Sequence, residues 1–295
     1  YRNNSGSSSV IAVNGATVTI SGFTIDSTAR RALRAYNGAN VTLDDVDIDG
    51  LTYSTSGSAL NCIDSGSLTI TGSTLSNNTA TSQGGAVYSN TCDVTISTST
   101  FDSNSAPTGG QIYVRDGDLS ITSSTVEDGT STSYGAGIYH EATSTSSSLD
   151  LTLDTVTFTS NASGNHGGAV HADDILTIDI DDCTFTSNTS TARAGALFLN
   201  QSGGRSPRAT LAIDGSTFSG NSAGTNGGAL YIERADTTID DCGFDDDDAT
   251  TSDGGAIYFV SGEEDLVVSN STFTGHDAVE GGALFLDADA SYTTS

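Results

Sequence analysis

The sequence predicts an all-β protein, folded as a right-handed, single-stranded parallel β-helix (a β-solenoid) of about ten coils. Two sequence marks recur together along almost the whole chain, which indicates structural repeats stacked on one another. Each repeat also contains short stretches in which apolar and polar residues alternate, the pattern of β-strands. Residues that favour helices are scarce, since the chain contains no Met and no Lys.

The first mark is a pair of small residues in front of an apolar strand, as in "GGAV" from Gly84. Most steps between its copies are 25 to 27 residues, and two steps are 32 and 33 residues. The clear copies begin at Gly84, Gly109, Gly135, Gly167, Ala194, Gly227, Gly254 and Gly281. Glycine tolerates a positive φ, so we expect a tight corner at this place in every coil.

The second mark is an apolar position, most often Phe, that stands 8 to 10 residues before the glycine from Ile48 onward. Asn frequently follows it three residues later, as in "FDSN". These asparagines are Asn78, Asn104, Asn161, Asn188 and Asn221. We expect them to form a second corner, to adopt the left-handed conformation there, and to stack their amides from coil to coil.

Stacking is what makes such repeats stable. One coil cannot bury its own apolar side chains, whereas coils about 4.8 Å apart bury one another's in continuous columns. Ten coils would form a rod of roughly 48 Å, and parallel crossovers of this kind are almost always right-handed. A β-propeller is the alternative fold, but its blades need about 40 residues or more.

We expect one β-helix domain over residues 1–295, with repeats from about residue 18 to residue 286. Because the sequence stops inside a coil, we interpret it as a segment of a longer chain. Its two ends should present open strand edges, which predicts either continuation of the chain or end-to-end stacking of subunits. No apolar run approaches the about 18 residues of a membrane span, so we expect no direct membrane insertion.

The formal net charge is −28, with nine arginines as the only basic residues. Nucleic acids and anionic membranes bind basic surfaces, so this charge argues against both as partners. The partners that remain are other surface proteins, further copies of the chain in an end-to-end or lateral polymer, and glycans.

The paired motif resembles the repeat of the chlamydial polymorphic outer membrane proteins. Its copies here include "FTSN" with "GGAV", between Phe158 and Val170, and "FSGN" with "GGAL", between Phe218 and Leu230. The resemblance covers most of the chain from about Ile25. It implies a right-handed parallel β-helix that is exported, and it implies an adhesin on a cell surface.

An enzyme is not expected. Polysaccharide lyases that act on acidic sugars need basic residues, but lysine is absent and the arginines are scattered apart from Arg30, Arg31 and Arg34. The four histidines stand in no recurring relation to the many carboxylates, as a hydrolase site would require. A carbohydrate-binding or polysaccharide-degrading β-helix is kept as the alternative function.

One column of aromatic residues is a candidate interface. It follows the apolar residue after each glycine pair, so it should point outward if that apolar residue points inward. Its members are Tyr88, Tyr113, Tyr139, His171, Phe198, Tyr231, Tyr258 and Phe285. An exposed aromatic stripe would mark a contact surface, whereas the alternative is that stacking or a covering loop makes it structural.

Four aspartates, Asp154, Asp181, Asp214 and Asp240, occupy the same position in consecutive coils. Stacked carboxylates repel one another, so something should offset the repulsion. Bound Ca²⁺, which takes oxygen ligands, is one candidate cofactor. The other explanation is an acidic surface adapted to a saline medium, where salt screens the charges.

The four cysteines and the glycosylation sequons complete the candidate sites. Cys183 and Cys242 share one inward position two coils apart, about 9.6 Å, which is too far for a disulfide. Cys62 and Cys92 lie near the same turn of neighbouring coils, where a disulfide is geometrically allowed, although Cys62 also fits an inward column. Candidate N-glycosylation sequons start at Asn77, Asn161, Asn188 and Asn270.

Together these observations predict a secreted or cell-surface β-helix rod with a structural or adhesive role. It would be one segment of a surface or filament-forming protein and would act through protein–protein or surface contacts.

Overall fold

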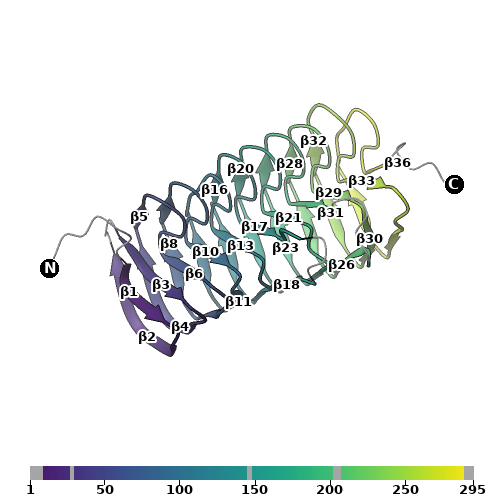
Figure 1. Cartoon of the computed structure of the whole chain (residues 1–295). Helices are drawn as coiled ribbons and strands as arrows, with labels where there is room; N and C mark the ends of the chain where they lie inside the picture. The colour runs from purple at the N-terminus through teal and green to yellow at the C-terminus, as the bar shows by residue number, and fades with distance from the viewer. Residues whose placement is uncertain (1–8, 27–29, 145–147, 202–206, 289–295) are drawn as a thin grey trace.

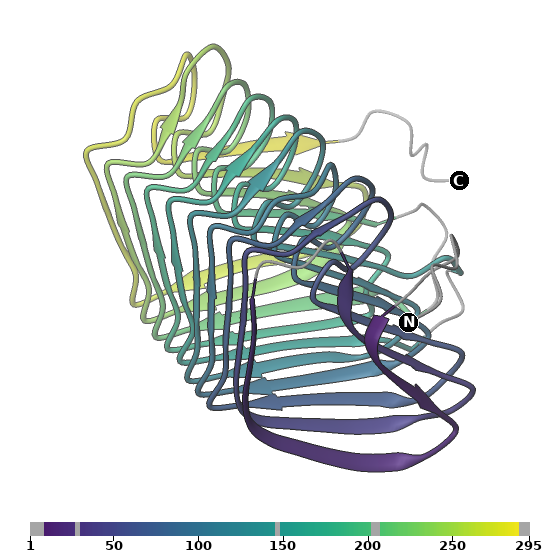
Figure 2. The same ribbon diagram turned by 90° about the vertical axis from the view of Figure 1, so that its left-hand side faces the viewer.

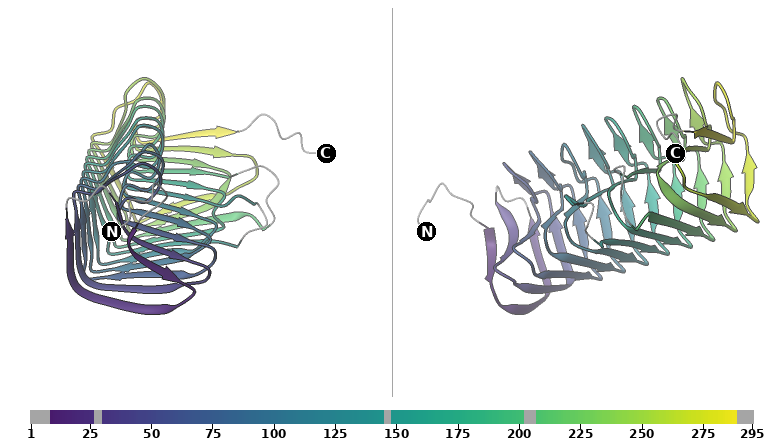
Figure 3. Two further views of the ribbon diagram at one scale, coloured as in Figure 1. Left: turned by 60° about the vertical axis from the view of Figure 1, so that its left-hand side comes forward. Right: turned by 45° about the vertical axis from the view of Figure 1, so that its right-hand side comes forward.

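The computed structural model describes residues 9–26, 30–144, 148–201 and 207–288, and these form a single rod of stacked coils (Figure 1). All regular structure in this part of the chain is β-strand. Successive coils lie side by side in chain order, with the N-terminal coil at one end of the rod and the C-terminal coil at the other (Figures 2 and 3). The predicted all-β parallel solenoid of about ten turns is confirmed.

Sheet A is an 11-stranded parallel sheet that receives one strand from each coil, directly after the glycine corner. Its strands, in spatial order, are β1 (Ser9–Asn14), β3 (Arg31–Tyr36), β6 (Leu60–Ile63), β10 (Val87–Asn90), β13 (Ile112–Arg115), β17 (Ile138–Glu141), β21 (Val170–Asp173), β25 (Leu197–Asn200), β29 (Leu230–Glu233), β33 (Ile257–Ser261) and β36 (Leu284–Ala288).

Sheet B has 18 strands in two columns, because most coils cross it with two strands separated by a kink. The first column holds β2 (Thr17–Asp26), β4 (Asn40–Asp49), β7 (Ser67–Thr71), β11 (Asp93–Ser97), β14 (Leu119–Thr122), β18 (Asp150–Asp154), β22 (Thr177–Asp181), β26 (Ala209–Asp214), β30 (Ala235–Asp240) and β34 (Leu266–Ser269). The second column holds β8 (Thr74–Ser76), β12 (Thr100–Asp102), β15 (Thr125–Glu127), β19 (Thr157–Thr159), β23 (Thr184–Thr186), β27 (Thr217–Ser219), β31 (Gly243–Asp245) and β35 (Thr272–Thr274).

Two-residue strands after the Asn corner make the third side of the rod. They form a five-stranded sheet and a separate pair. The five are β16 (Thr130–Ser131), β20 (Ala162–Ser163), β24 (Thr189–Ser190), β28 (Ser222–Ala223) and β32 (Asp248–Ala249), and the pair is β5 (Thr52–Tyr53) with β9 (Thr79–Ala80).

The core is made of columns of equivalent residues, as the repeat predicts. Phe158, Phe185, Phe218 and Phe244 stack with ring centroids 4.8 Å apart and nearly parallel planes. On the opposite side, the first residue of each sheet A strand pairs in register with its neighbours and is buried, as Val87 and Ile112 are. Coils at the two ends are more exposed, since each has a neighbouring coil on one side only; Val10 is 51% exposed and Leu286 is 62% exposed.

The asparagine corner contains a buried ladder of amides. The side-chain oxygen of Asn188 accepts a hydrogen bond from the backbone N–H of Asn161 at 3.0 Å, and its Nδ2 donates to the carbonyl of Phe158 at 3.0 Å. Asn221 repeats both bonds one coil further on, to Asn188 and to Phe185. These asparagines are fully buried. Each amide therefore satisfies backbone groups that the corner would otherwise leave without partners.

The expected left-handed conformation of these asparagines is wrong. It belongs instead to the residue just before each one, as in Ser160 and Ser187, both with φ of 55°. Turning the chain one residue earlier points the asparagine side chain inward, where its amide can reach the backbone of the neighbouring coil. At the other corner the expectation is confirmed, with φ of 60° at Gly84 and 56° at Ala194.

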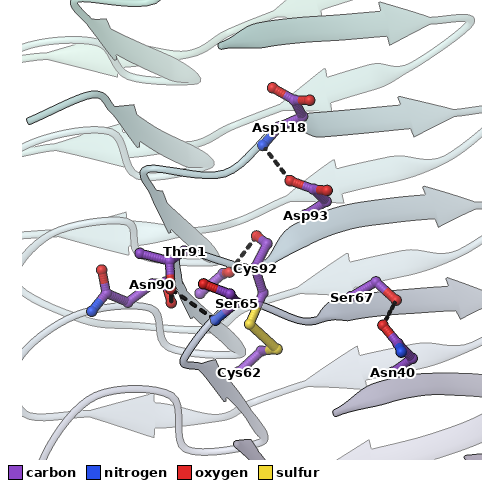
Figure 4. The surroundings of a disulfide bond; sticks show 10 residues. Asn40, Cys62, Ser65, Ser67, Asn90, Thr91, Cys92, Asp93 and Asp118 are labelled. Carbon is purple, nitrogen blue, oxygen red and sulfur yellow. Dashed lines mark hydrogen bonds between the residues drawn. A yellow bond between two sulfur atoms is a disulfide. The ribbon is translucent and has the colours of Figure 1, made fainter. Parts of the chain in front are cut away.

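Cys62 and Cys92 form a disulfide between neighbouring coils, with their Cα atoms 6.1 Å apart. Figure 4 shows Cys62, from β6, bonded to Cys92, in the turn that follows β10. Both cysteines are buried, so the inward column and the disulfide turn out to be compatible. Cys183 and Cys242 are buried and free, as predicted. The sulfur of Cys183 takes the place of a serine hydroxyl, accepting a hydrogen bond from the N–H of Val156 at 3.4 Å.

Candidate functional site

The predicted aromatic column exists on the outer side of sheet A. Tyr88 pairs in register with Tyr113, and Tyr113 with Tyr139. The rings of these three tyrosines stack with centroids 5.3 Å apart. His171 continues the column between Tyr139, at 4.8 Å, and Phe198, at 4.6 Å. The column runs on through Tyr231 and Tyr258 to Phe285.

The prediction that this column is exposed is wrong. Tyr113 is 2% exposed, His171 3% and Phe198 4%, and the rings of Tyr231 and Tyr258 are also buried. Tyr88 and Phe285 are half-buried. The column is therefore a second, outer layer of packing and not a bare interface. For this reason the first three residues of most sheet A strands are buried. The period-2 pattern alone does not indicate this, because it predicts that the middle one of the three faces solvent.

In three coils, the residue that immediately precedes the corner residue of positive φ (Gly135, Gly167 or Ala194) covers part of the column. The chain reverses at the positive φ of the glycine, so the side chain before it lies back over sheet A. Tyr134 packs against His171 with centroids 5.1 Å apart, and His166 stacks on Phe198 at 4.6 Å. The guanidinium of Arg193 lies 4.7 Å from the ring centre of Tyr231. We call Tyr134, His166 and Arg193 the lid residues.

In β17, β21, β29 and β36 an acidic residue stands two positions after the aromatic one and lies beside the aromatic column. The hydroxyl of Tyr139 donates to Asp173 at 2.9 Å, and Tyr113 bonds to Glu141 in the same manner. Nε2 of His171 lies 3.0 Å from the same carboxylate, that of Asp173. Burial opposes the charge of Asp173, but hydrogen bonds from His171, Asn200 and Tyr139 outweigh it and hold the pKa of Asp173 below its ordinary value.

These elements surround a groove of about 440 Å³ over β17, β21, β25 and β29. It is lined by Tyr134, Tyr139, His166, His171, Asp173, Arg193, Phe198, Asn200 and Glu233. We call it the central groove. Its mixture of aromatic faces, imidazoles, carboxylates and one guanidinium is suited to bind a polar ligand that also has apolar faces.

Two imidazole nitrogens at the central groove are buried and make no hydrogen bond to the described residues. They are Nδ1 of His166 and Nδ1 of His171. Burial, together with the nearby His171 and Arg193, lowers the pKa of His166 to about 4. His166 is thus neutral near pH 7 and can accept or donate a hydrogen bond without carrying charge.

The repeat pattern of the sequence does not indicate this groove. Its histidines follow no repeat, so a search for recurring His–carboxylate relations passed over them. The available signal was "HAD", because alternation places His171 and Asp173 on the same face of a strand. A second signal was "NHGG", which puts His166 directly before a corner glycine, the lid position.

The aspartate column is confirmed as a stack: Asp154 pairs with Asp181, Asp181 with Asp214, and Asp214 with Asp240. Slight desolvation and the charges of Asp182, Asp214 and Asp154 raise the pKa of Asp181, as expected for neighbouring carboxylates. Hydrogen bonds from Ser269 and Asn270 instead lower the pKa of Asp240. Among the described residues, no three His, Cys, Asp or Glu side chains converge as a metal site would require. Calcium binding at this column stays a prediction.

Two of the four candidate glycosylation sequons cannot be used in the folded chain. Asn161 and Asn188 are fully buried members of the amide ladder, so the prediction is wrong for both. Asn77 and Asn270 are exposed at positive φ and remain candidates.

No helix of the described residues is long and apolar enough to cross a membrane. Residues 9–173 match the family model of a right handed beta helix region. Residues 215–233 match the model of the Chlamydia polymorphic membrane protein repeat, and this segment contains the copy "FSGN" with "GGAL". The resemblance to that repeat is thereby confirmed. Neither the curated proteins nor the solved structures contain a match to the chain.

Proposed function

Because the chain belongs to the family of right-handed β-helix regions, we propose that it is a structural and adhesive rod on the outside of a cell. The match of residues 215–233 to a repeat of membrane-associated surface proteins supports the location. The disulfide between Cys62 and Cys92 supports it as well, since such bonds persist in oxidising, extracellular surroundings.

The observation that carries the adhesive role is the central groove. It opens on the flank of the rod, where three successive lid residues interrupt the otherwise polar surface with Tyr, His and Arg. Tyr and Arg are among the residues that contribute most to binding at protein surfaces. The coils underneath are fixed by stacked rings and hydrogen bonds, so the groove is preorganised for a ligand.

Bead adhesion tests this proposal. Beads coated with the chain should be retained under flow on a layer of cells, and the change His166→Ala should reduce retention at least fivefold. Asn226→Ala is the matched control, because Asn226 holds the same lid position two coils away from His166, outside the groove. Retention no better than that of uncoated beads would refute the adhesive role.

Binding or cleavage of a polysaccharide is the second candidate function. It is favoured by the hydrogen-bonded pair of His171 and Asp173 beside His166, which brings together groups able to move protons. The release of reducing ends from a panel of polysaccharides distinguishes the two. Cleavage that is abolished by His171→Ala would establish the enzyme, whereas the adhesive rod releases none.

A further inference from the structure

A second groove of about 520 Å³ lies on the same flank of the rod, near its N-terminal end. Strands β3, β6 and β10 form its floor, and residues 53–56 form one wall. It is lined by Arg31, Arg34, Tyr53, Ser54, Thr55, Ser56, Asn61, Ile63 and Tyr88. We call it the arginine groove.

None of the described residues that line the arginine groove bears a carboxylate, although the chain carries 37 acidic residues and nine arginines. The central groove contains Asp173 and Glu233, and two further grooves near the C-terminal end also include acidic side chains. Charge is unevenly distributed along the sequence as well. Residues 1–66 hold four arginines and six aspartates, whereas residues 67–295 hold five arginines and 31 acidic residues.

Arg31 is fixed in the wall of this groove. Its Nε donates to the carbonyl of Gly57 at 2.9 Å, its Nη2 donates to the carbonyl of Ser56 at 2.6 Å, and its guanidinium lies 4.4 Å from the ring centre of Tyr53. Burial and the nearby charge of Arg34 lower the pKa of Arg31 to about 10, although Tyr53 and Tyr88 oppose the shift. Arg31 therefore still carries a full positive charge at neutral pH.

Arg34 has no such partners. Its guanidinium lies 5.1 Å from the ring centre of Tyr36, and its Nε is buried without a hydrogen-bond partner in the part of the chain that the structure describes. Neither Arg34 nor Arg31 forms a salt bridge with any carboxylate of the described residues. Two neighbouring positive charges, one of them with unused donors, are thus held at a groove without a counter-charge. A carboxylate that accepts hydrogen bonds from Arg34 would remove this repulsion.

We infer that the arginine groove binds a sugar that bears one carboxylate, presented at the end of an otherwise neutral glycan. Arg34 would take the carboxylate, because a guanidinium pairs with it through two parallel hydrogen bonds. Ser54, Thr55 and Asn61 supply donors and acceptors for sugar hydroxyls, and the rings of Tyr53 and Tyr88 supply apolar faces. The inference adds a second contact site, with its ligand class, to the proposed adhesive rod and rests on that function.

The overall charge limits the ligand to a single carboxylate. A chain with net charge −28 repels polyanions and other copies of itself over a Debye length of about 8 Å or more. The N-terminal coils are nearly neutral, so this repulsion is weaker beside them than along the rest of the rod. An acidic peptide would also use Arg34, but it would offer Ser54, Thr55 and Asn61 backbone amides in place of the several hydroxyl groups of a sugar.

Titration of the full chain with glucuronic acid and, separately, with glucose tests the inference, with binding followed by calorimetry. We expect saturable binding of glucuronic acid and at least tenfold weaker binding of glucose. Arg34→Gln should weaken glucuronic acid binding at least tenfold without lowering the melting temperature, since Arg34 makes no salt bridge. Arg208→Gln is the control and should leave binding unchanged, because Arg208 pairs with Glu263 far from the groove.

Equal affinities for glucuronic acid and glucose, or wild-type affinity in Arg34→Gln, would overturn the inference. Tighter binding of N-acetylaspartate than of glucuronic acid would assign the groove to an acidic peptide instead. If polygalacturonate bound more tightly per carboxylate than glucuronic acid does, the limit to a single carboxylate would be contradicted. Bead retention is measured separately. If glucuronic acid did not bind while the beads were still retained, this inference would be refuted and the proposed adhesive rod would not be affected.

Discussion

Each coil turns at an asparagine corner and at a glycine corner, and the two corners differ in how much their side chains vary from coil to coil. At the asparagine corner five coils of the described chain place the same buried amide on backbone groups of the preceding coil; these amides belong to Asn78, Asn104, Asn161, Asn188 and Asn221. At the glycine corner the residue before the glycine changes in each coil; those residues are Gln83, Thr108, Tyr134, His166, Arg193, Asn226, Asp253 and Glu280. Buried backbone groups allow few solutions, whereas a side chain lying over the outer flank is free to vary and to carry function.

The largest effect is expected from Asn188→Ala. This change leaves the N–H of Asn161 and the carbonyl of Phe158 buried without partners, which should cost about 3 to 5 kcal/mol of stability. Thermal unfolding followed by circular dichroism measures the loss. Asn226→Ala is the matched control at the glycine corner, where its amide contacts only the hydroxyl of Ser252, and should cost less than about 1 kcal/mol. Equal losses at the two positions would remove the distinction between the corners.

The disulfide joins only two coils, so its removal should weaken the rod at one place, whereas the amide ladder runs through several coils. Replacing Cys62 and Cys92 by serine together releases a loop closed by residues 30 positions apart and should cost about 3 kcal/mol. The melting temperature of the double variant, compared with that of the oxidised wild-type chain, measures this loss, and the reduced wild-type chain should melt together with the variant. If the double variant and the reduced wild-type chain melted many degrees apart, the loss would have to be assigned to the serine hydroxyls and not to the disulfide bond.

In the coil after Asn221, Asp247 stands in place of asparagine at this corner. Its Oδ1 accepts hydrogen bonds from Asn221, and its Oδ2 is buried without a partner among the described residues. Burial raises the pKa of Asp247 to about 7. A raised pKa means that its contribution to stability is complete below about pH 4 and is lost as the pH rises to about 7, at up to about 1.4 kcal/mol per pH unit.

Asp247→Asn should therefore stabilise the chain at pH 8 by about 2 kcal/mol or more and should change little at pH 4. Melting temperatures of the variant and the wild type between pH 4 and pH 8 measure the difference. A difference that stays the same across this range would show that Asp247 is not buried in its charged form.

A smaller effect is expected on the outer flank. His171→Ala removes one ring from the aromatic column and one hydrogen bond from Asp173, which should cost about 1 to 2 kcal/mol. Bead retention should fall far more than this modest loss of stability explains. A loss as large as that of Asn188→Ala would make the outer layer as essential to the fold as the amide ladder.

The smallest effect is expected at the aspartate column of Asp154, Asp181, Asp214 and Asp240. Sodium chloride should raise the melting temperature slightly by screening these exposed carboxylates. The calcium prediction requires a further rise when calcium chloride replaces sodium chloride at equal ionic strength, reversed by a chelator. Identical melting temperatures in the two salts would refute calcium binding.

The sequence was sufficient to predict the coil, because columns of Ile, Leu and Phe recur in register and stacking is the only way to bury them. It did not predict that the aromatic column is covered, since the lid residue Tyr134, which packs on Tyr139 and His171, comes from a different part of the coil. It missed the central groove for the same reason, as His166 and Asp173 meet only through the reversal at Gly167. Non-repeating residues that are joined by tertiary contact leave little periodic signal.

The most direct test of the division between the corners is bead retention of Asn188→Ala and His166→Ala at a temperature where both are folded. The account predicts that Asn188→Ala beads are retained like wild type and that His166→Ala beads lose most of their retention. Wild-type retention of His166→Ala together with loss of retention by Asn188→Ala would contradict it.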